Sequence, residues 1–132
     1  MYYKYDPANS IEVPEPFHRF MTPLFMGDDD KIKGCAFSCH ITEWPAGCEI
    51  DSHVHPDGTE AMYLMSGQGK CWVDNVEYDF VPGSMIVAPP GVQHKIRNTG
   101  DEMLRVFCVF NPPVTGASLK ERALAAVKES KE

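Results

Sequence analysis

Closely spaced prolines and glycines are the feature that most limits how this chain can fold. Eleven prolines and ten glycines occur among its 132 residues, nearly all of them before residue 115. The short segments between them are rich in aromatic and β-branched side chains, which favour strands. This pattern predicts an all-β sandwich or barrel. We expect strands over residues 35–42, 49–54, 61–65, 70–73, 77–80, 84–88 and 103–110.

Several turns between these strands can be recognised from their residues. Asp74 and Asn75 separate two apolar runs and predict a tight hairpin, because Asp and Asn tolerate positive φ. Pro82 and Gly83 suit the central positions of a type II turn. Residues 98–101 indicate a further reversal.

The last part of the chain has a different character. Ser118 and Glu121 form a Ser-x-x-Glu capping box, which predicts a short amphipathic helix that packs on the barrel or on a partner subunit. We therefore divide the chain into an N-terminal segment (1–34), a barrel (35–115) and a C-terminal helix (116–132).

The charge balance and the apolar runs exclude two classes of partner. Acidic residues outnumber basic ones 19 to 12, and the net charge of −7 argues against binding of nucleic acid. No run of about 18 apolar residues is present, so no membrane span is expected. The first residues lack the pattern of a signal peptide, and we expect the protein to stay in the cytoplasm.

Three histidines and one glutamate form the candidate functional site. His53 and His55 are two apart, so on a strand both face the same side, about 6.6 Å apart along the chain. A turn follows, and Glu60 on the returning run would lie opposite them. His94, after the rigid Pro-Pro-Gly turn, supplies a third imidazole. This nitrogen and oxygen ligand set suits one divalent ion of iron, manganese, nickel, cobalt, copper or zinc, with about two coordination positions left for water or substrate.

The spacing of these residues resembles the cupin superfamily. Its first motif is matched by Gly47, His53, His55, Glu60 and Gly67. Its second motif is matched by Gly83, Pro89, Gly91, His94 and Asn98. The resemblance implies a small bacterial metal-binding cupin with a jelly-roll β-barrel, commonly a homodimer with exchanged edge strands, a role that residues 17–24 could fill.

Residues around the ion are predicted from strand alternation. Met62 and Leu64 should share a face with Glu60, and Ile96 with His94, which gives a largely apolar wall. Candidates for a second catalytic group are His18, Arg19, His40, Tyr63, Arg97 and Arg105. Each is better explained as a sheet-surface or dimer-contact residue, so the sequence assigns no catalytic base.

The cysteines give little further information. They are odd in number and lack Cys-x-x-Cys spacing, which favours free thiols that are mostly buried. The alternative, that one or two face the metal pocket, stays open. The five are Cys35, Cys39, Cys48, Cys71 and Cys108.

The ligand set also limits the function. A divalent ion with three neutral imidazoles and one carboxylate carries a local charge of about +1, which favours small anionic, oxygenated ligands. The favoured hypothesis is a metal-dependent enzyme with non-redox isomerase, lyase or ring-opening chemistry. The alternatives are a metal-dependent dioxygenase or decarboxylase, and a non-enzymatic cupin that binds or senses a small ligand.

Overall fold

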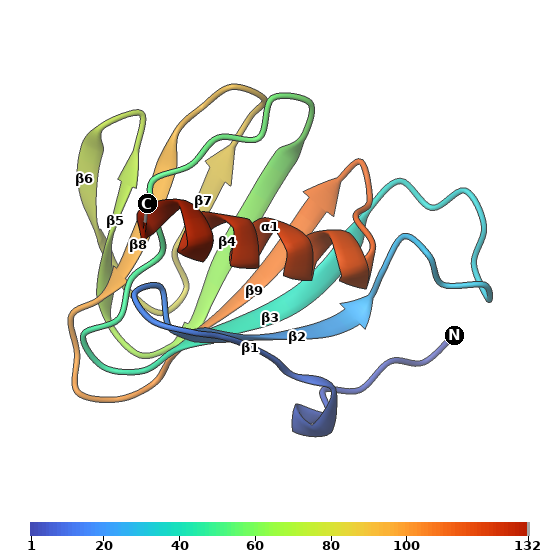
Figure 1. Cartoon of the computed structure of the whole chain (residues 1–132), viewed down its shortest axis with the longest axis horizontal. Coiled ribbons are helices and arrows are strands. Elements are labelled where there is room, and N and C mark those ends of the chain that lie inside the picture. Colours follow the sequence, from blue (N-terminus) through green and yellow to red (C-terminus); the bar gives the residue numbers. More distant parts are fainter. Residues whose placement is uncertain (132) are drawn as a thin grey trace.

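Two antiparallel sheets form the body of the protein in a computed structural model that describes residues 1–131 (Figure 1). The larger sheet has the order β1-β2-β3-β9-β4-β7, and the smaller one has the order β6-β5-β8. The elements are η1 (Pro7–Asn9), β1 (Ile11–Val13), β2 (Arg19–Phe25), β3 (Ser38–Trp44), β4 (Thr59–Ser66), β5 (Gly69–Val73), β6 (Val76–Phe80), β7 (Met85–Ala88), β8 (His94–Asn98), β9 (Leu104–Asn111) and α1 (Gly116–Ser130). This is the predicted all-β jelly roll with one C-terminal helix. In the part of the chain that the structure describes, no helix is both long and apolar enough to cross a bilayer.

The prediction of a strand over residues 49–54 is wrong. This segment makes only two single bridges, Glu49 to Arg97 and His53 to His94. The bridged residues are four positions apart on the segment but only three positions apart on β8. The extra residue shifts the register between the bridges and prevents a continuous ladder. The other six predicted strands are present, with their ends shifted by up to three residues.

The N-terminal segment contributes two strands that the sequence did not reveal. β2 pairs with β3 of the same chain, from Phe20 opposite Glu43 to Phe25 opposite Cys39. Pro23 obscures β2 in the sequence, and the register shifts between Pro23 and Phe25. Strands from residues 1–34 and from the barrel thus share one sheet. Exchange of this segment between subunits stays a prediction.

The predicted turns are present. Asp74 and Asn75 both have positive φ, at 51° and 66°, as a two-residue hairpin of type I′ requires. Gly83 has φ of 91°, and the Ser84 amide donates to the Val81 carbonyl over 3.0 Å. Asn98 also closes a turn, because its side-chain Oδ1 accepts a 3.0 Å hydrogen bond from the Gly100 amide.

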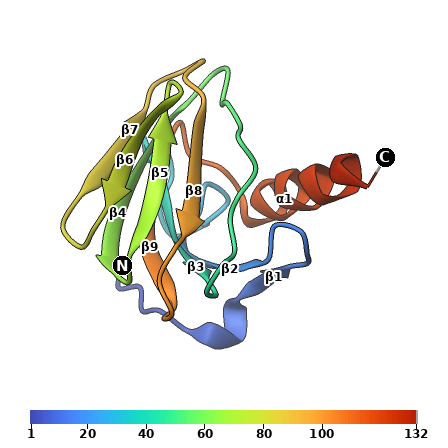
Figure 2. The same cartoon turned by 90° about the vertical axis from the view of Figure 1, so that its left-hand side faces the viewer.

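Two clusters of buried apolar side chains hold the fold together. The first lies between the sheets and includes Trp44, Leu64, Phe80, Ile96 and Leu104, each at most 2% exposed. The second joins α1 to the edge of the larger sheet, and Figure 2 shows α1 beside the hairpin of β1 and β2. Its members are Val13, Met21, Met26, Phe110, Val114, Leu119, Ala123 and Val127.

The predicted helix begins at residue 116, as observed, but its predicted N-cap is three residues too late. Thr115 is the N-cap, and its hydroxyl accepts a 3.0 Å hydrogen bond from the Ser118 amide. Ser118 therefore lies inside the first turn and does not cap the helix. The helix ends at Ser130, and Glu132 of the predicted range 116–132 lies outside the described residues.

Candidate metal centre

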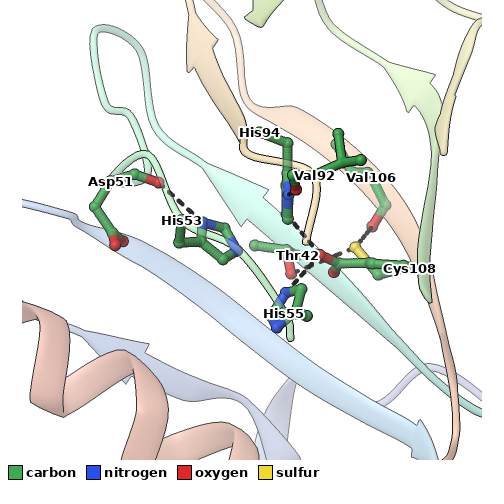
Figure 3. Close-up of polar contacts among 9 residues, drawn as sticks. Thr42, Asp51, His53, His55, Val92, His94, Val106 and Cys108 are labelled. Carbon is green, nitrogen blue, oxygen red and sulfur yellow. Dashed lines mark hydrogen bonds and ion pairs between the residues drawn. The ribbon is translucent and has the colours of Figure 1, made fainter. Parts of the chain in front are cut away.

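The four predicted ligands meet at one place, although they come from three parts of the chain. Ligand atoms of His53, His55, Glu60 and His94 all lie within 4.8 Å of one another. His94 begins β8, Glu60 lies near the start of β4, and the other two belong to the irregular segment before β4. Figure 3 shows the three imidazoles turned toward a common point.

Backbone hydrogen bonds fix this arrangement. His53 and His94 exchange both backbone bonds, at 3.1 and 3.0 Å, so their rings lie side by side with centroids 4.1 Å apart. The Gly91 amide donates to the His55 carbonyl over 2.9 Å. Gly91 has the positive φ of 80° expected from its place in the Pro-Pro-Gly turn. The turn before β8 therefore supports a histidine 36 positions earlier in the sequence.

Hydrogen bonds to backbone carbonyls orient two of the rings. His53 Nδ1 donates to the Asp51 carbonyl over 2.9 Å, and His94 Nδ1 approaches the Val92 carbonyl at 3.4 Å. With the proton on Nδ1, each ring presents the lone pair of Nε2 to the centre. This is how metal-ligating histidines are usually held.

The contacts of Glu60 test whether the site suits a cation. Its Oε1 lies 3.0 Å from Nε2 of His94 and 3.3 Å from Nε2 of His55. A neutral His94 has only one N–H, yet both of its ring nitrogens face an acceptor oxygen. A cation between Nε2 and the carboxylate satisfies both groups. The donor set therefore fits a divalent metal ion.

Burial keeps the His53 imidazole, and hydrogen bonds keep the Glu60 carboxylate, in the form that binds metal. Burial, assisted by the neighbouring His94, lowers the pKa of His53 to about 4, so its ring is neutral at pH 7. Burial alone would raise the pKa of Glu60. Hydrogen bonds from His55 and His94 outweigh that effect, hold the pKa of Glu60 well below its usual range, and keep the carboxylate ionised.

The centre opens into a cavity of about 520 Å³. As strand alternation predicts, Met62 and Leu64 are buried on the same face as Glu60, and Ile96 on the same face as His94. Met62 and Phe110 line the cavity, while Leu64 and Ile96 belong to the core cluster. Helix α1 completes another part of the wall with Leu119, Arg122, Ala123 and Ala126.

The candidates for a second catalytic group divide into three sets. Arg19 and His40 are buried and line the cavity. Tyr63 and Arg97 are exposed on the sheets. The remaining two contact carboxylates near the surface: Arg105 Nε donates to Glu43 over 2.9 Å, and His18 Nε2 lies 3.2 Å from Glu12.

Several lining residues were not found from the sequence, although strand alternation could have found Thr42 and Trp44. Thr42 and Trp44 follow His40 at intervals of two on β3 and share its face. Arg122 comes from the face of α1 that meets the cavity, which only the packing of the helix defines.

The cysteines are free thiols throughout the described chain. Cys108 alone among the five lines the cavity, which answers the question that the sequence left open. Burial raises its pKa well above the usual value, so it is a neutral thiol at pH 7.

Comparison with known proteins identifies the class. A sequence model described as the cupin domain matches residues 40–110, more than half of the chain. Together with the jelly-roll fold, this match shows that the chain belongs to the cupin family.

Particular relatives within this class are ectoine synthases. L-ectoine synthase of Rhodococcus erythropolis is 39% identical over 88 residues, covering 64% of each protein. L-ectoine synthase of Aliivibrio fischeri is 36% identical over 93 residues, covering 69% of this chain and 71% of the relative. The chain thus spans 64% to 71% of the length of these relatives. The crystal structure of ectoine synthase from P. lautus superposes with a TM-score of 0.71 at 28% identity, covering 89% of this chain and 78% of the other.

Proposed function

We propose that this cupin is a metal-dependent enzyme that acts on a small anionic, oxygenated molecule by non-redox isomerase, lyase or ring-opening chemistry. The observation that carries the proposal is the convergence of His53, His55, Glu60 and His94 within 4.8 Å at the wall of the cavity. Relatives named as synthases of a small molecule favour an enzyme over a binding or sensing module.

The chain's own residues supply most of what such a reaction requires. His53, His55, Glu60 and His94 would hold one divalent ion, which when bound polarises a substrate oxygen and stabilises negative charge that develops on it. Met62 and Phe110 form an apolar wall that excludes water from that side of the substrate.

His40 is the group best placed to hold or move a proton. It is 2% exposed, lines the cavity, and has one ligand-type atom within 4.8 Å of both Glu60 and Cys108. Burial lowers its pKa to about 4, so at pH 7 the neutral ring offers a lone pair at one nitrogen and a proton at the other.

Elemental analysis and activity assays test the proposal together. The purified protein should retain about one divalent metal ion per chain, and His94→Ala should lose it, whereas His18→Ala at the surface should not. The metal-loaded protein should then convert an anionic substrate without consuming oxygen. Oxygen uptake would support a dioxygenase instead, and tight binding without any product would support a binding module. Equal metal content in His94→Ala and the wild type would contradict the ligand assignment.

A further inference from the structure

The cavity has a second polar region, on β2 and β3, apart from the four candidate metal ligands. Arg19 enters the cavity from β2, and His40 and Thr42 enter it from the neighbouring strand β3. All three are at most 4% exposed. We propose that Arg19, supported by His40 and Thr42, binds a carboxylate of the substrate while a second oxygen group of the same molecule reaches the metal centre. This inference rests on the proposed function and narrows its substrate class.

Arg19 has unused hydrogen-bonding capacity in a buried place. Its Nη1 donates to the Phe17 carbonyl over 2.9 Å, which is the only hydrogen bond of its side chain to residues 1–131. No carboxylate of those residues lies within 4.0 Å of the guanidinium, which makes no ion pair there. A buried guanidinium without an anionic partner is uncommon, because buried charges are normally paired. A ligand carboxylate would supply the missing partner in the bidentate geometry that arginine favours.

The neighbours on β3 also lack partners. His40 Nδ1 makes no hydrogen bond within the described chain, although buried polar atoms are nearly always paired. The Thr42 hydroxyl accepts only a long contact of 3.9 Å from Cys108 Sγ, so its own proton remains free to donate. This wall can therefore offer donors to the oxygens of a ligand.

The charges of the cavity favour a ligand with two oxygen groups. Arg19 carries one positive charge, and the metal-loaded centre would carry about one more. Asp51 and Glu60 attract Arg19 electrostatically across the same cavity, without forming an ion pair within 4.0 Å. A small molecule with a carboxylate at one end and a hydroxy-acid or keto-acid group at the other can satisfy both positions.

A matched pair of small acids tests this inference. Malate and 2-hydroxybutanoate share the α-hydroxy acid end and the chain length, but only malate carries a second carboxylate. Titration calorimetry on Co²⁺-loaded protein should show that malate binds about 10- to 100-fold more tightly, as expected for a charged hydrogen-bonded pair. Equal affinities for the two acids, or no measurable binding of malate, would overturn the inference.

Variants identify the residue responsible. Arg19→Met should remove the preference for malate while the Co²⁺ content stays at one per chain. Arg19→Lys keeps the charge but not the planar fork, and should retain part of the preference. If Arg19→Met does not fold, Arg19→Lys alone shows whether Arg19 is responsible for the preference for malate. Arg105→Met, a change at an arginine outside the cavity, should leave the preference intact, and a malate preference that survives both Arg19 changes would contradict the assignment.

Metal content separates failure of this inference from failure of the proposed function. If the wild type does not retain Co²⁺, the proposed function is wrong, and the same pair of acids is titrated into the metal-free protein. An Arg19-dependent preference for malate would then support the carboxylate site alone, and its absence would overturn that site as well.

Discussion

Glu60 and His94 stand on strands, whereas His53 and His55 come from a segment that forms no continuous ladder with either sheet. Glu60 is paired on both sides, with Ala88 of β7 and Phe110 of β9. The two loop histidines depend instead on a bridge to β8 and on the amide of Gly91. Half of the candidate centre is therefore positioned by sheet register and half by individual hydrogen bonds.

Removal of a strand-borne ligand should have the largest effect. His94 touches Glu60, pairs with His53 and is 1% exposed. We expect His94→Ala to weaken Co²⁺ binding by more than about 100-fold, beyond the effect of losing an outer partner. His55→Ala should cost less, because the His55 side chain is more exposed, at 13%. Competition titration with a chelator measures the Co²⁺ affinity of both variants. A larger loss of affinity for His55→Ala than for His94→Ala would contradict the expectation that the strand ligand matters more.

The pH dependence of folding stability tests whether burial in the cavity wall on β3 keeps His40 neutral. His40 has a pKa of about 4 when folded, against an ordinary value of 6.5. As the pH falls from about 7 to 4, the unfolded state gains a proton that the folded state does not accept, so folding stability decreases. The loss is about 3 kcal/mol for this group.

Chemical unfolding of the metal-free protein at several pH values measures this loss. The His40→Gln protein should lose about 3 kcal/mol less than the wild type over the same range. The His18→Gln change at the surface serves as a control and should leave the pH profile unchanged. Parallel profiles for His40→Gln and the wild type would show that His40 is not held neutral by burial.

Asn98 anchors the end of β8 opposite His94. Its side-chain amide donates to the Trp44 carbonyl over 2.8 Å and to the Glu102 carbonyl over 2.7 Å. Asn98→Ala leaves these acceptors unpaired and should destabilise the fold by about 2 kcal/mol. Denaturant unfolding measures the loss, with the exposed Asn9→Ala as control. A similar loss in both variants would show that the anchor contributes little.

A glycine change tests the loop half of the centre with the smallest expected effect. Gly91 has positive φ and nothing within 4 Å of an added Cβ, so Gly91→Ala strains only the backbone, by about 1 kcal/mol. Because the Gly91 amide holds His55, Co²⁺ affinity should fall by a few fold. Gly34→Ala has a similar φ of 72° and equally open space, yet should leave metal affinity unchanged. Equal Co²⁺ affinities in the two variants would show that the turn at Gly91 does not position the metal ligand His55.

Local patterns in the sequence predicted most of the fold and all four residues of the candidate centre. Strand alternation placed Met62 and Leu64 with Glu60, and residue types at Asp74 and Asn75 predicted the hairpin. These features depend on neighbours in the chain, which the sequence displays directly.

Non-local relations account for what was missed. The segment 49–54 fails as a strand because it has one residue more than the stretch of β8 beside it, a mismatch that appears only when the two are aligned in space. β2 was obscured by Pro23, which the sheet accommodates at a shift in register. Arg19 could be suspected from the sequence, but its lack of an ionic partner depends on which strands lie next to β2.

Leu119 and Ala123 belong to two structures at once, since each is part of the second core cluster and of the cavity wall. Packing of α1 against the sheet and binding of a ligand in the cavity are therefore thermodynamically linked. If a ligand binds the cavity more tightly when α1 is packed on the sheet, binding of that ligand stabilises the packed position of α1 by the same free energy. A tightly bound compound should accordingly slow amide hydrogen exchange along α1, even though it makes no contact with most of that helix.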